Sequence, residues 1–302
     1  MFSFRTLLPR KAAAFLACTL ISSFASAQTV EAPTREIWKA GGMAVTAIQD
    51  LSAEMAVSLF KGPASEQEKS KHFTNDKAEA GINVFLLRTG GKIVLFDTGT
   101  GSAFRSPGKL FEALASLNVK PEEVDLVLLT HMHPDHIGGL LREGQRAFPK
   151  AKLRVSKPEI ESWLAILETD ISNAPAGHIK HMIDIYGTDV LPFAFGDTLL
   201  PGVTALDASG HTPGHTVFQL TAGGKSLLIV GDLIHAMPLQ FALPDECAEF
   251  DMDPPQAIAA RKRIFGLAAQ KAIPIAGMHF PFANAVGTVK KDGKGWKFKR
   301  VK

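Results

Sequence analysis

The feature that most constrains this chain is a short run in which three histidines and an aspartate stand within six residues. The run is Thr130-His131-Met132-His133-Pro134-Asp135-His136-Ile137-Gly138-Gly139. It follows directly on the apolar stretch 124–129, which predicts a buried β-strand. The polar cluster therefore falls at a strand end, where α/β proteins usually place their chemistry. Because Zn²⁺ favours imidazole and carboxylate ligands, the run predicts a metal site at the edge of a sheet.

The first 27 residues have the pattern of a secretory signal peptide. The basic start consists of Arg5, Arg10 and Lys11, and residues 12–24 form the apolar centre. The cleavage signature of small residues is Ala25-Ser26-Ala27. We expect cleavage before Gln28 and a periplasmic or secreted mature chain. The apolar centre is too short for a lasting membrane anchor, and no later stretch is long enough, so we expect no membrane association after cleavage. Lipidation at Cys18 is the alternative, although the residues before it match such a site imperfectly.

The composition of the mature chain, residues 28–302, limits the kinds of protein that it can be. With 46% apolar and 21% charged residues, the sequence has ample material for a core. Removal of residues 1–27 takes away three basic side chains and no acidic one, which lowers the formal net charge from +3 to zero. This charge gives no reason to expect a nucleic acid partner. Only Cys247 remains, so no intramolecular disulfide can form. No linker divides the mature chain, and we predict a single domain.

Apolar patterns predict the secondary structure of much of this domain. Strands are expected at 43–48, 82–88, 92–96, 124–129, 152–156, 203–207, 216–221, 226–230 and 273–276, and helices at 53–60, 107–117, 158–167 and 254–270. Glycine-rich turns at 89–91 and 222–224 predict hairpins. Because the strands form two sets flanked by helices, we predict an α/β (α+β) fold with two packed sheets and helices outside.

Three segments are expected to lie outside this regular framework. Residues 28–35 are predicted to be a flexible arm, residues 61–80 an exposed excursion of helix and loop, and the lysine-rich segment after Lys290 a solvated hairpin. The pattern of residues 169–195 favours no single structure.

Side chains of metal-ligand type follow three later apolar segments. His211 and His215 stand on a loop shaped by glycine and proline, Asp232 follows the stretch 227–231, and His279 follows 273–278. Singly, each has an ordinary interpretation, such as a solvated turn histidine or a helix-capping aspartate. Together with the first run, their order favours one shared site.

The patterns HMHPDH, PGH, GD and MH together resemble the metallo-β-lactamase superfamily in its dinuclear hydrolase form. The resemblance extends over residues 83–281. The stretches GGKSLLIVGDLI, QFALPDECAEFDMDPPQA and GMHFPF are similar to the branch of methyl parathion hydrolase and quorum-quenching lactonases. The resemblance implies the metallo-β-lactamase fold, a four-layer αββα sandwich.

The resemblance also implies two divalent metal ions. His131, His133 and His215 would bind one ion, Asp135, His136 and His279 the other, and Asp232 would bridge both. We predict His215 rather than His211 as the ligand, because His215 lies closest to the next strand and matches the PGH histidine of the family. His211 is expected to stand behind the direct ligands. Zn²⁺ is the expected ion, and Mn²⁺, Fe²⁺ or Co²⁺ accept the same ligands.

The implied activity is hydrolysis of an ester, lactone or phosphotriester bond in a small molecule. Two ions lower the pKa of a shared water to about 7 and form a bridging hydroxide, with Asp135 and Asp232 as catalytic residues. No G-x-S-x-G motif signals a serine nucleophile. The relatives suggest a homodimer.

Three alternative functions remain open. A β-lactamase is disfavoured because those enzymes lack a bridging aspartate at this position. A glyoxalase II-type thioesterase is disfavoured because no basic cluster for glutathione is evident near the C-terminal site. A non-catalytic metal-binding protein is disfavoured because every ligand position is filled.

Four further residues have two interpretations each. His235 stands where lactonases of this superfamily often have a tyrosine, and it is either a catalytic proton donor or shuttle or an exposed loop residue. Asp97 in the FDTG turn either orients a ligand imidazole or forms an Asx turn. Phe104 and Trp163 are either walls of a substrate pocket or ordinary core residues.

Overall fold

Two seven-stranded sheets form the framework of the computed structural model, which describes residues 33–104 and 106–301. The predictions for the signal peptide and for Cys18 lie outside the described residues. The first sheet has the order β1 (Thr34–Ala40), β2 (Met43–Ala56), β4 (Lys77–Thr89), β5 (Lys92–Phe96), β6 (Leu126–Leu128), β9 (Lys152–Ser156), β10 (Val190–Phe193). Strands β5, β6, β9 and β10 run parallel, so their carboxyl ends share one edge of the sheet.

The second sheet contributes the other loops of the site. Its order is β11 (Thr198–Leu200), β12 (Val203–Asp207), β13 (Thr216–Ala222), β14 (Lys225–Ile229), β16 (Ile275–Ala276), β17 (Val286–Asp292), β18 (Gly295–Arg300). Strands β14 and β16 are parallel, and the other pairs are antiparallel. Two short pairs complete the strands of the described residues: β3 (Phe60–Lys61) with β15 (Cys247–Ala248), and β7 (Leu141–Arg142) with β8 (Gln145–Arg146).

Alternation along strand β4 shows how the layers are built. Phe85 and Leu87 point to the second sheet, where they pack with Phe218 and Ile229, whereas Leu86 lies among residues of the helices on the other face. This follows from the two-residue period of a strand, and burial of each such side chain stabilises the fold by about 1.5–3 kcal/mol.

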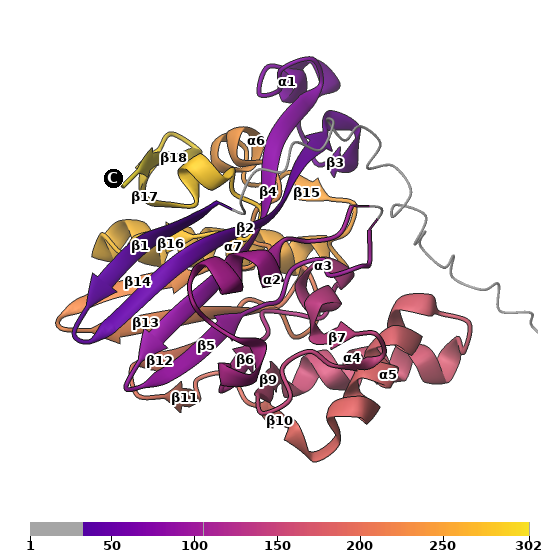
Figure 1. The fold of residues 1–302 in the computed structure, drawn as a ribbon. Coiled ribbons are helices and arrows are strands. Elements are labelled where there is room, and N and C mark those ends of the chain that lie inside the picture. Colours follow the sequence, from indigo (N-terminus) through magenta and orange to yellow (C-terminus); the bar gives the residue numbers. More distant parts are fainter. Residues whose placement is uncertain (1–32, 105, 302) are drawn as a thin grey trace, which may run out of the picture.

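Helices cover the outer face of each sheet (Figure 1). The first sheet is covered by α2 (Leu110–Ser116), α4 (Lys157–Thr169) and α5 (Ala174–Tyr186), and the second by α6 (Met237–Ala242) and α7 (Pro254–Lys271). The short helix α3 (Pro134–Ile137) follows the histidine run. The four layers confirm the predicted αββα sandwich. Among the described residues, no helix is both long and apolar enough to cross a membrane.

The glycine turns confirm both predicted hairpins. Gly90 and Gly91 have φ angles of 53° and 75° between β4 and β5, and Gly223 and Gly224 have 53° and 73° between β13 and β14. Two successive positive φ angles match the twist of a tight hairpin and are accessible to glycine at little cost.

The helix predicted at 53–60 is wrong. Strand β2 continues to Ala56 and pairs with β4, with Ala53 opposite Ala80 and Met55 opposite Ala78. Ala53 and Met55 are buried while Ser52 and Glu54 are exposed, which is the period of a half-buried strand. Alanine, glutamate and methionine favour helices intrinsically, but pairing with a neighbouring strand overrides that preference.

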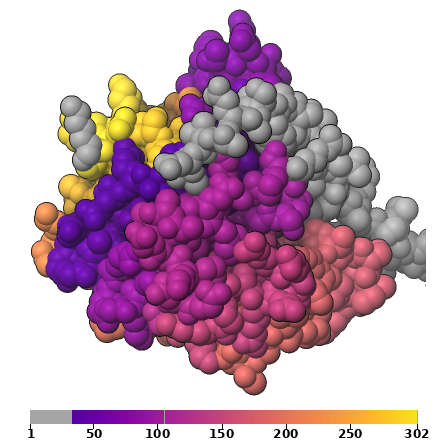
Figure 2. All heavy atoms as spheres, in the orientation of Figure 1, coloured from indigo at the N-terminus to yellow at the C-terminus, as the bar shows by residue number. Residues whose placement is uncertain are grey.

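Other segments outside the core differ from or refine the expectations. Thr34 and Arg35 belong to β1, so the flexible-arm prediction is wrong for them, and 28–32 lie outside the described residues. The excursion at 61–80 contains α1 (Glu66–Ser70), which projects from the body with the tip of the β2–β4 pair (Figures 1 and 2). The lysine-rich terminal segment is the β17–β18 hairpin. The unassigned segment 169–195 contains α5 and β10.

Candidate metal centre

Five strand ends bring the predicted site residues together at one edge of the sandwich. Asp97 follows β5, the histidine run follows β6, His211 lies between β12 and β13, Asp232 follows β14, and His279 follows β16. The first two loops belong to one sheet and the other three to its partner. The site therefore lies between the two sheets and depends on their packing.

The first group of candidate ligands consists of His131, His133, His211 and Asp232, all buried. His133 Nδ1 lies 3.0 Å from His131 Nε2 and 2.9 Å from His211 Nε2. His211 Nε2 lies 3.3 Å from Asp232 Oδ2. Three imidazole nitrogens and one carboxylate oxygen thus converge in the way that a four-coordinate ion requires.

The second group consists of Asp135, His136 and His279. Asp135 Oδ2 lies 3.6 Å from His136 Nε2 and 3.4 Å from His279 Nε2. Asp232 also reaches this group, because its Oδ1 lies 3.2 Å from His136 Nε2 and its Oδ2 lies 3.0 Å from His279 Nε2. One carboxylate is therefore shared by both groups. The Asp135 side chain is 18% exposed, so the second group opens toward solvent on that side.

Partners outside the two groups fix the orientation of four imidazole rings. The outward contacts are Thr130 Oγ1 to His131 Nδ1 at 3.1 Å, Asp97 Oδ2 to His136 Nδ1 at 2.8 Å, Asp251 Oδ1 to His211 Nδ1 at 2.8 Å, and Gly81 O to His279 Nδ1 at 3.0 Å. Thr130 Oγ1 donates to Asp97 Oδ2, so it is left to accept from His131. Each partner accepts a hydrogen bond from Nδ1–H, so the lone pair of Nε2 is turned inward, as metal ligation requires.

The centre contains buried polar atoms that the protein alone does not satisfy. His136 Nε2 and Asp232 Oδ1 are buried 3.2 Å apart and make no hydrogen bond. An unsatisfied buried polar atom costs about 1–3 kcal/mol. A cation between these atoms would satisfy both, so the donor set fits a divalent metal ion.

Burial and neighbouring charges separate the pKa values of the two groups of histidines. Burial lowers the pKa of His131 and His133 well below the ordinary value, and neighbouring histidines add to the effect. Burial acts in the same direction on His136 and His279, but Asp232 and Asp135 outweigh it and raise the pKa of both rings. Burial raises the pKa of Asp232, but the neighbouring His136 and His279 outweigh burial and hold this pKa well below its usual range. The carboxylate of Asp232 therefore stays ionised.

The structure contradicts the placement of His215 among the ligands. Its Nε2 accepts a hydrogen bond from the Asp232 backbone N–H at 3.0 Å, and its Nδ1 donates to the Ala208 carbonyl at 3.1 Å. With both ring nitrogens engaged, no lone pair remains for an ion. Burial lowers the pKa of His215 to about 3, so the ring is a neutral part of the core. His211, not His215, faces His131 and His133.

The structure places the four residues that had two interpretations in the sequence. Asp97 accepts from the Thr130 backbone N–H at 2.8 Å and contacts His136, so it orients a candidate ligand. His235 is only 2% exposed, so the exposed-loop interpretation is wrong; its Nε2 lies 3.2 Å from Asp232 Oδ2. Trp163 is a core residue whose ring meets His133 edge-on at 5.7 Å. Phe104 is half-buried on the loop after β5.

Glu159 and Asp251 are residues of the centre that sequence reasoning missed. Asp251 holds His211, and Glu159 accepts a hydrogen bond from the backbone of Met132, between two candidate ligands. Neither stands in a ligand motif, and only their place near chemistry-bearing loops in space identifies them. Cys247 is buried, and burial raises the pKa of its thiol to about 12, which excludes a thiolate nucleophile at neutral pH.

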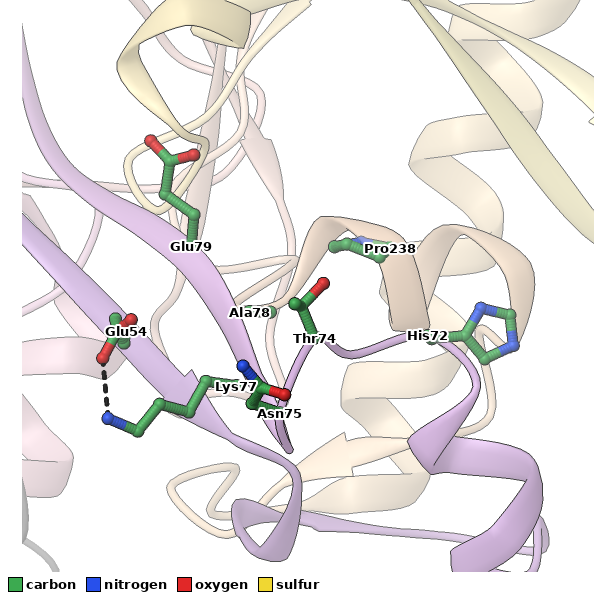
Figure 3. A pocket seen from close by; sticks show the side chains of 8 residues that line it. All are labelled: Glu54, His72, Thr74, Asn75, Lys77, Ala78, Glu79 and Pro238. Carbon is green, nitrogen blue, oxygen red and sulfur yellow. Dashed lines mark hydrogen bonds and ion pairs between the residues drawn. The ribbon is translucent and has the colours of Figure 1, made fainter.

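A surface pocket lies elsewhere, beside the projecting β2–β4 pair. Glu54, Thr74, Lys77 and Glu79 line it together with Pro238 of α6 (Figure 3). None of the candidate ligands lines this pocket. The candidate chemistry therefore belongs to the sheet edge and not to this pocket.

A four-layer αββα sandwich with two histidine and aspartate groups at its edge defines a class of metal-binding α/β protein. Residues 79–274 match the metallo-beta-lactamase superfamily, and the chain belongs to that superfamily.

Two solved structures share this fold over most of the chain. The hydrolase AbOPH of the beta-lactamase superfamily is 29% identical, with a TM-score of 0.81 over 91% of this chain and 99% of that chain. The dizinc quorum-quenching lactonase AidC, in complex with the product N-hexanoyl-L-homoserine, is 24% identical, with a TM-score of 0.82 over 90% of this chain and 98% of that chain.

Similarity to one of the curated relatives is more partial. A ribonuclease of Thermus thermophilus is 30% identical over 162 residues, which are 49% of this chain and 34% of that protein. The chain thus spans about a third of the length of this relative. The superfamily also includes nucleases, so the family alone does not define the bond that is cleaved.

Proposed function

We propose that this chain is an exported hydrolase that uses two divalent metal ions, expected to be Zn²⁺, to cleave ester, lactone or phosphotriester bonds of small molecules. The observation that carries the proposal is the shared carboxylate of Asp232, which contacts His211 of the first group and both His136 and His279 of the second. One group alone would make a single-ion site, whereas a shared carboxylate joins two. The similarity to the hydrolase AbOPH supports hydrolysis, and the shared fold of the lactonase AidC is consistent with a lactone among the substrates.

The proposed ligands follow from the two groups. His131, His133 and His211 would hold one ion, Asp135, His136 and His279 the other, and Asp232 both. When bound, the two ions supply Lewis-acid activation of water and of the substrate oxygen. Asp232 would hold the pair with its ionised carboxylate, and the outward partners hold four of the imidazoles in the required tautomer.

His235 is placed to hold a proton beside this centre. Asp232 is ionised and can only accept, so the neutral ring of His235 donates through Nε2–H to Asp232 Oδ2. Its Nδ1 then carries a lone pair, and that atom has no partner among the described residues. Burial lowers the pKa of His235, which keeps the ring neutral at pH 7. Nδ1 is therefore a buried acceptor, which takes a proton or hydrogen bond only from a group that enters the centre.

Two measurements on the purified mature chain test this function. The first is the metal content, for which we expect about two ions per chain. The second is a panel of an acyl-homoserine lactone, an aryl ester, methyl parathion, a cephalosporin, S-lactoylglutathione, and single-stranded RNA and DNA. We expect turnover of the lactone, ester or phosphotriester that a chelator abolishes. Turnover restricted to the cephalosporin, the thioester or a nucleic acid would contradict the proposal.

Export and assembly are separate parts of the proposal. The basic and apolar pattern of residues 1–27 supports export, and mass spectrometry of the mature protein should find Gln28 at the N-terminus. A homodimer is expected from the resemblance, and analytical ultracentrifugation of the mature chain tests it.

A further inference from the structure

The start of helix α4 lies against both loops that carry the imidazoles of the first group. Glu159, in the first turn of α4, is fully buried. Its Oε1 accepts hydrogen bonds from the Met132 backbone N–H at 2.9 Å and from Trp163 Nε1 at 2.8 Å. Its Oε2 accepts from Thr212 Oγ1 at 2.6 Å and from the Gly214 backbone N–H at 3.0 Å. Each carboxylate oxygen therefore serves a different loop.

The residues that Glu159 holds stand next to the candidate ligands. Met132 lies between His131 and His133, and Thr212 follows His211 directly. Trp163, which shares Oε1 with Met132, packs its ring edge-on against His133. The carboxylate thus fixes the backbone beside all three imidazoles of the first group. All four partners donate, so the side chain acts as an acceptor only and has no oxygen left to bind an ion.

The backbone of the 211–215 loop lies very close to the start of α4. Ser156 Oγ donates to the Gly214 carbonyl at 2.6 Å, and a Cβ at Gly214 would lie 2.2 Å from the Glu159 backbone nitrogen. Only glycine permits this distance. The second group has different supports: Asp97 contacts His136, and the Gly81 carbonyl contacts His279.

We propose that Glu159 is a positioning residue that sets the geometry of the three imidazoles of the first metal-binding group by tying the two loops that carry them to the start of α4. Removing one of its oxygens releases one loop and lets the imidazoles of the first group drift apart, while the second group keeps its own supports. The inference rests on the proposed function, because it assigns the first group to a metal ion. It adds that the affinities of the two ions can be changed separately.

The test is a zinc titration of the metal-free mature chain against a chromophoric chelator, which resolves two affinities. Glu159→Gln replaces one acceptor oxygen with an NH₂ group that cannot accept from these donors. We expect one affinity to fall about 10- to 100-fold, the usual range for such outer partners, and the other to stay within about threefold. With Co²⁺ in place of zinc, the absorption bands of the four-coordinate ion should weaken in the variant. At saturating zinc, kcat should recover most of its wild-type value.

Two further variants keep the inference testable if Glu159→Gln folds poorly. Thr212→Val removes one donor to Oε2 and should weaken the same affinity by a smaller factor. Glu161→Gln, on the same helix but exposed and, within the described part of the chain, paired with Lys157, is the matched control and should leave both affinities unchanged. Equal weakening of both affinities, or unchanged affinities in Glu159→Gln and Thr212→Val, would overturn the inference. Fewer than two ions on the wild-type chain would instead refute the proposed function.

Discussion

The two metal-binding groups differ in the atoms that they offer to an ion. The first group presents three imidazoles, whereas the second presents two imidazoles and the carboxylate of Asp135, and Asp232 serves both. Nitrogen-rich sites favour zinc, and additional carboxylate oxygens make a site more tolerant of Mn²⁺ and Fe²⁺. The two ions of the proposed function would therefore have unequal chemistry, and the second group would be the more exchangeable position.

The supports of the two groups also come from different parts of the chain. Glu159 on α4 and Asp251 hold the first group, whereas Asp97 after β5 and strand β4 hold the second. On β4, Asn83 Nδ2 donates to the Gly277 carbonyl at 3.1 Å and to the Phe280 carbonyl at 2.7 Å, which fixes the turn around His279. Damage to Glu159 or Asp251 should therefore leave the second group in place, whereas Asp97 also reaches His131 of the first group through Thr130.

The largest effect is expected where the two groups meet. In Asp232→Asn the shared side chain loses its charge, and one of its two oxygens becomes an NH₂ group that cannot bind an ion. We expect turnover to fall by orders of magnitude and the zinc content to drop below two per chain. The circular dichroism spectrum should stay unchanged, because the Asp232 backbone bond to His215 remains. An active variant with two ions would remove the bridging role of Asp232.

The next effect separates the two neighbouring histidines. His211→Ala removes a ring that faces His131 and His133, so we expect loss of one bound ion and of most activity. His215→Gln, the matched variant, offers an amide in place of a ring that bonds only to backbone, so it should keep both ions with some loss of thermal stability. Metal analysis of the two proteins decides between them. The opposite pattern would restore His215 as the ligand.

Each outer partner should act mainly on the group whose ring it contacts directly. Asp97→Asn weakens the hold on His136 Nδ1, and Asp251→Asn weakens the hold on His211 Nδ1. We expect a loss of about 10- to 100-fold in the affinity of one ion in each variant, the second ion for Asp97→Asn and the first for Asp251→Asn. Titration with zinc shows which step weakens. If both variants weakened the same step, the groups would share their supports.

Protons should compete with metal more strongly at the second group. In the metal-free chain, burial lowers the pKa of His211, but the carboxylates of Asp232 and Asp251 outweigh burial and raise this pKa to about 9. His131 and His133 stay neutral, because their pKa values are well below the ordinary value. His136 and His279 both have a raised pKa. Below about pH 6.5, an ion must then displace one proton at the first group and two at the second.

This difference should appear in how the metal affinity of each group depends on pH. As the pH falls below about 6.5, we expect affinity to drop about tenfold per pH unit at the first group and about 100-fold at the second. Calorimetry in buffers of different ionisation enthalpy counts the protons released in each step. Equal release in both steps would contradict the difference between the groups.

Local pattern was enough to predict much of this molecule. The glycine hairpins, strands such as 152–156 and 203–207, and helix α7 follow from periodicity and turn residues near in sequence. His131, His133, Asp135 and His136 stand in one run, so their proximity follows from the chain itself. These features need no knowledge of which segments pack together.

Features that depend on packing could not be predicted in this way. The choice between His211 and His215 depends on how far the loop extends past the sheet edge. His215, which is nearer to the strand, forms hydrogen bonds with backbone atoms instead of facing the other histidines. Glu159 acts across 27 and 53 residues of sequence, so no local motif marks it. Residues 53–56 continue β2 because β4 lies beside them, which their own helical preference does not reveal.

A crystal of the zinc-loaded chain, with anomalous scattering measured at the zinc edge, tests the central claim most directly. We predict two anomalous peaks, one contacted by His131, His133 and His211, the other by Asp135, His136 and His279, and both by Asp232. A single peak, or a peak contacted by His215, would contradict it.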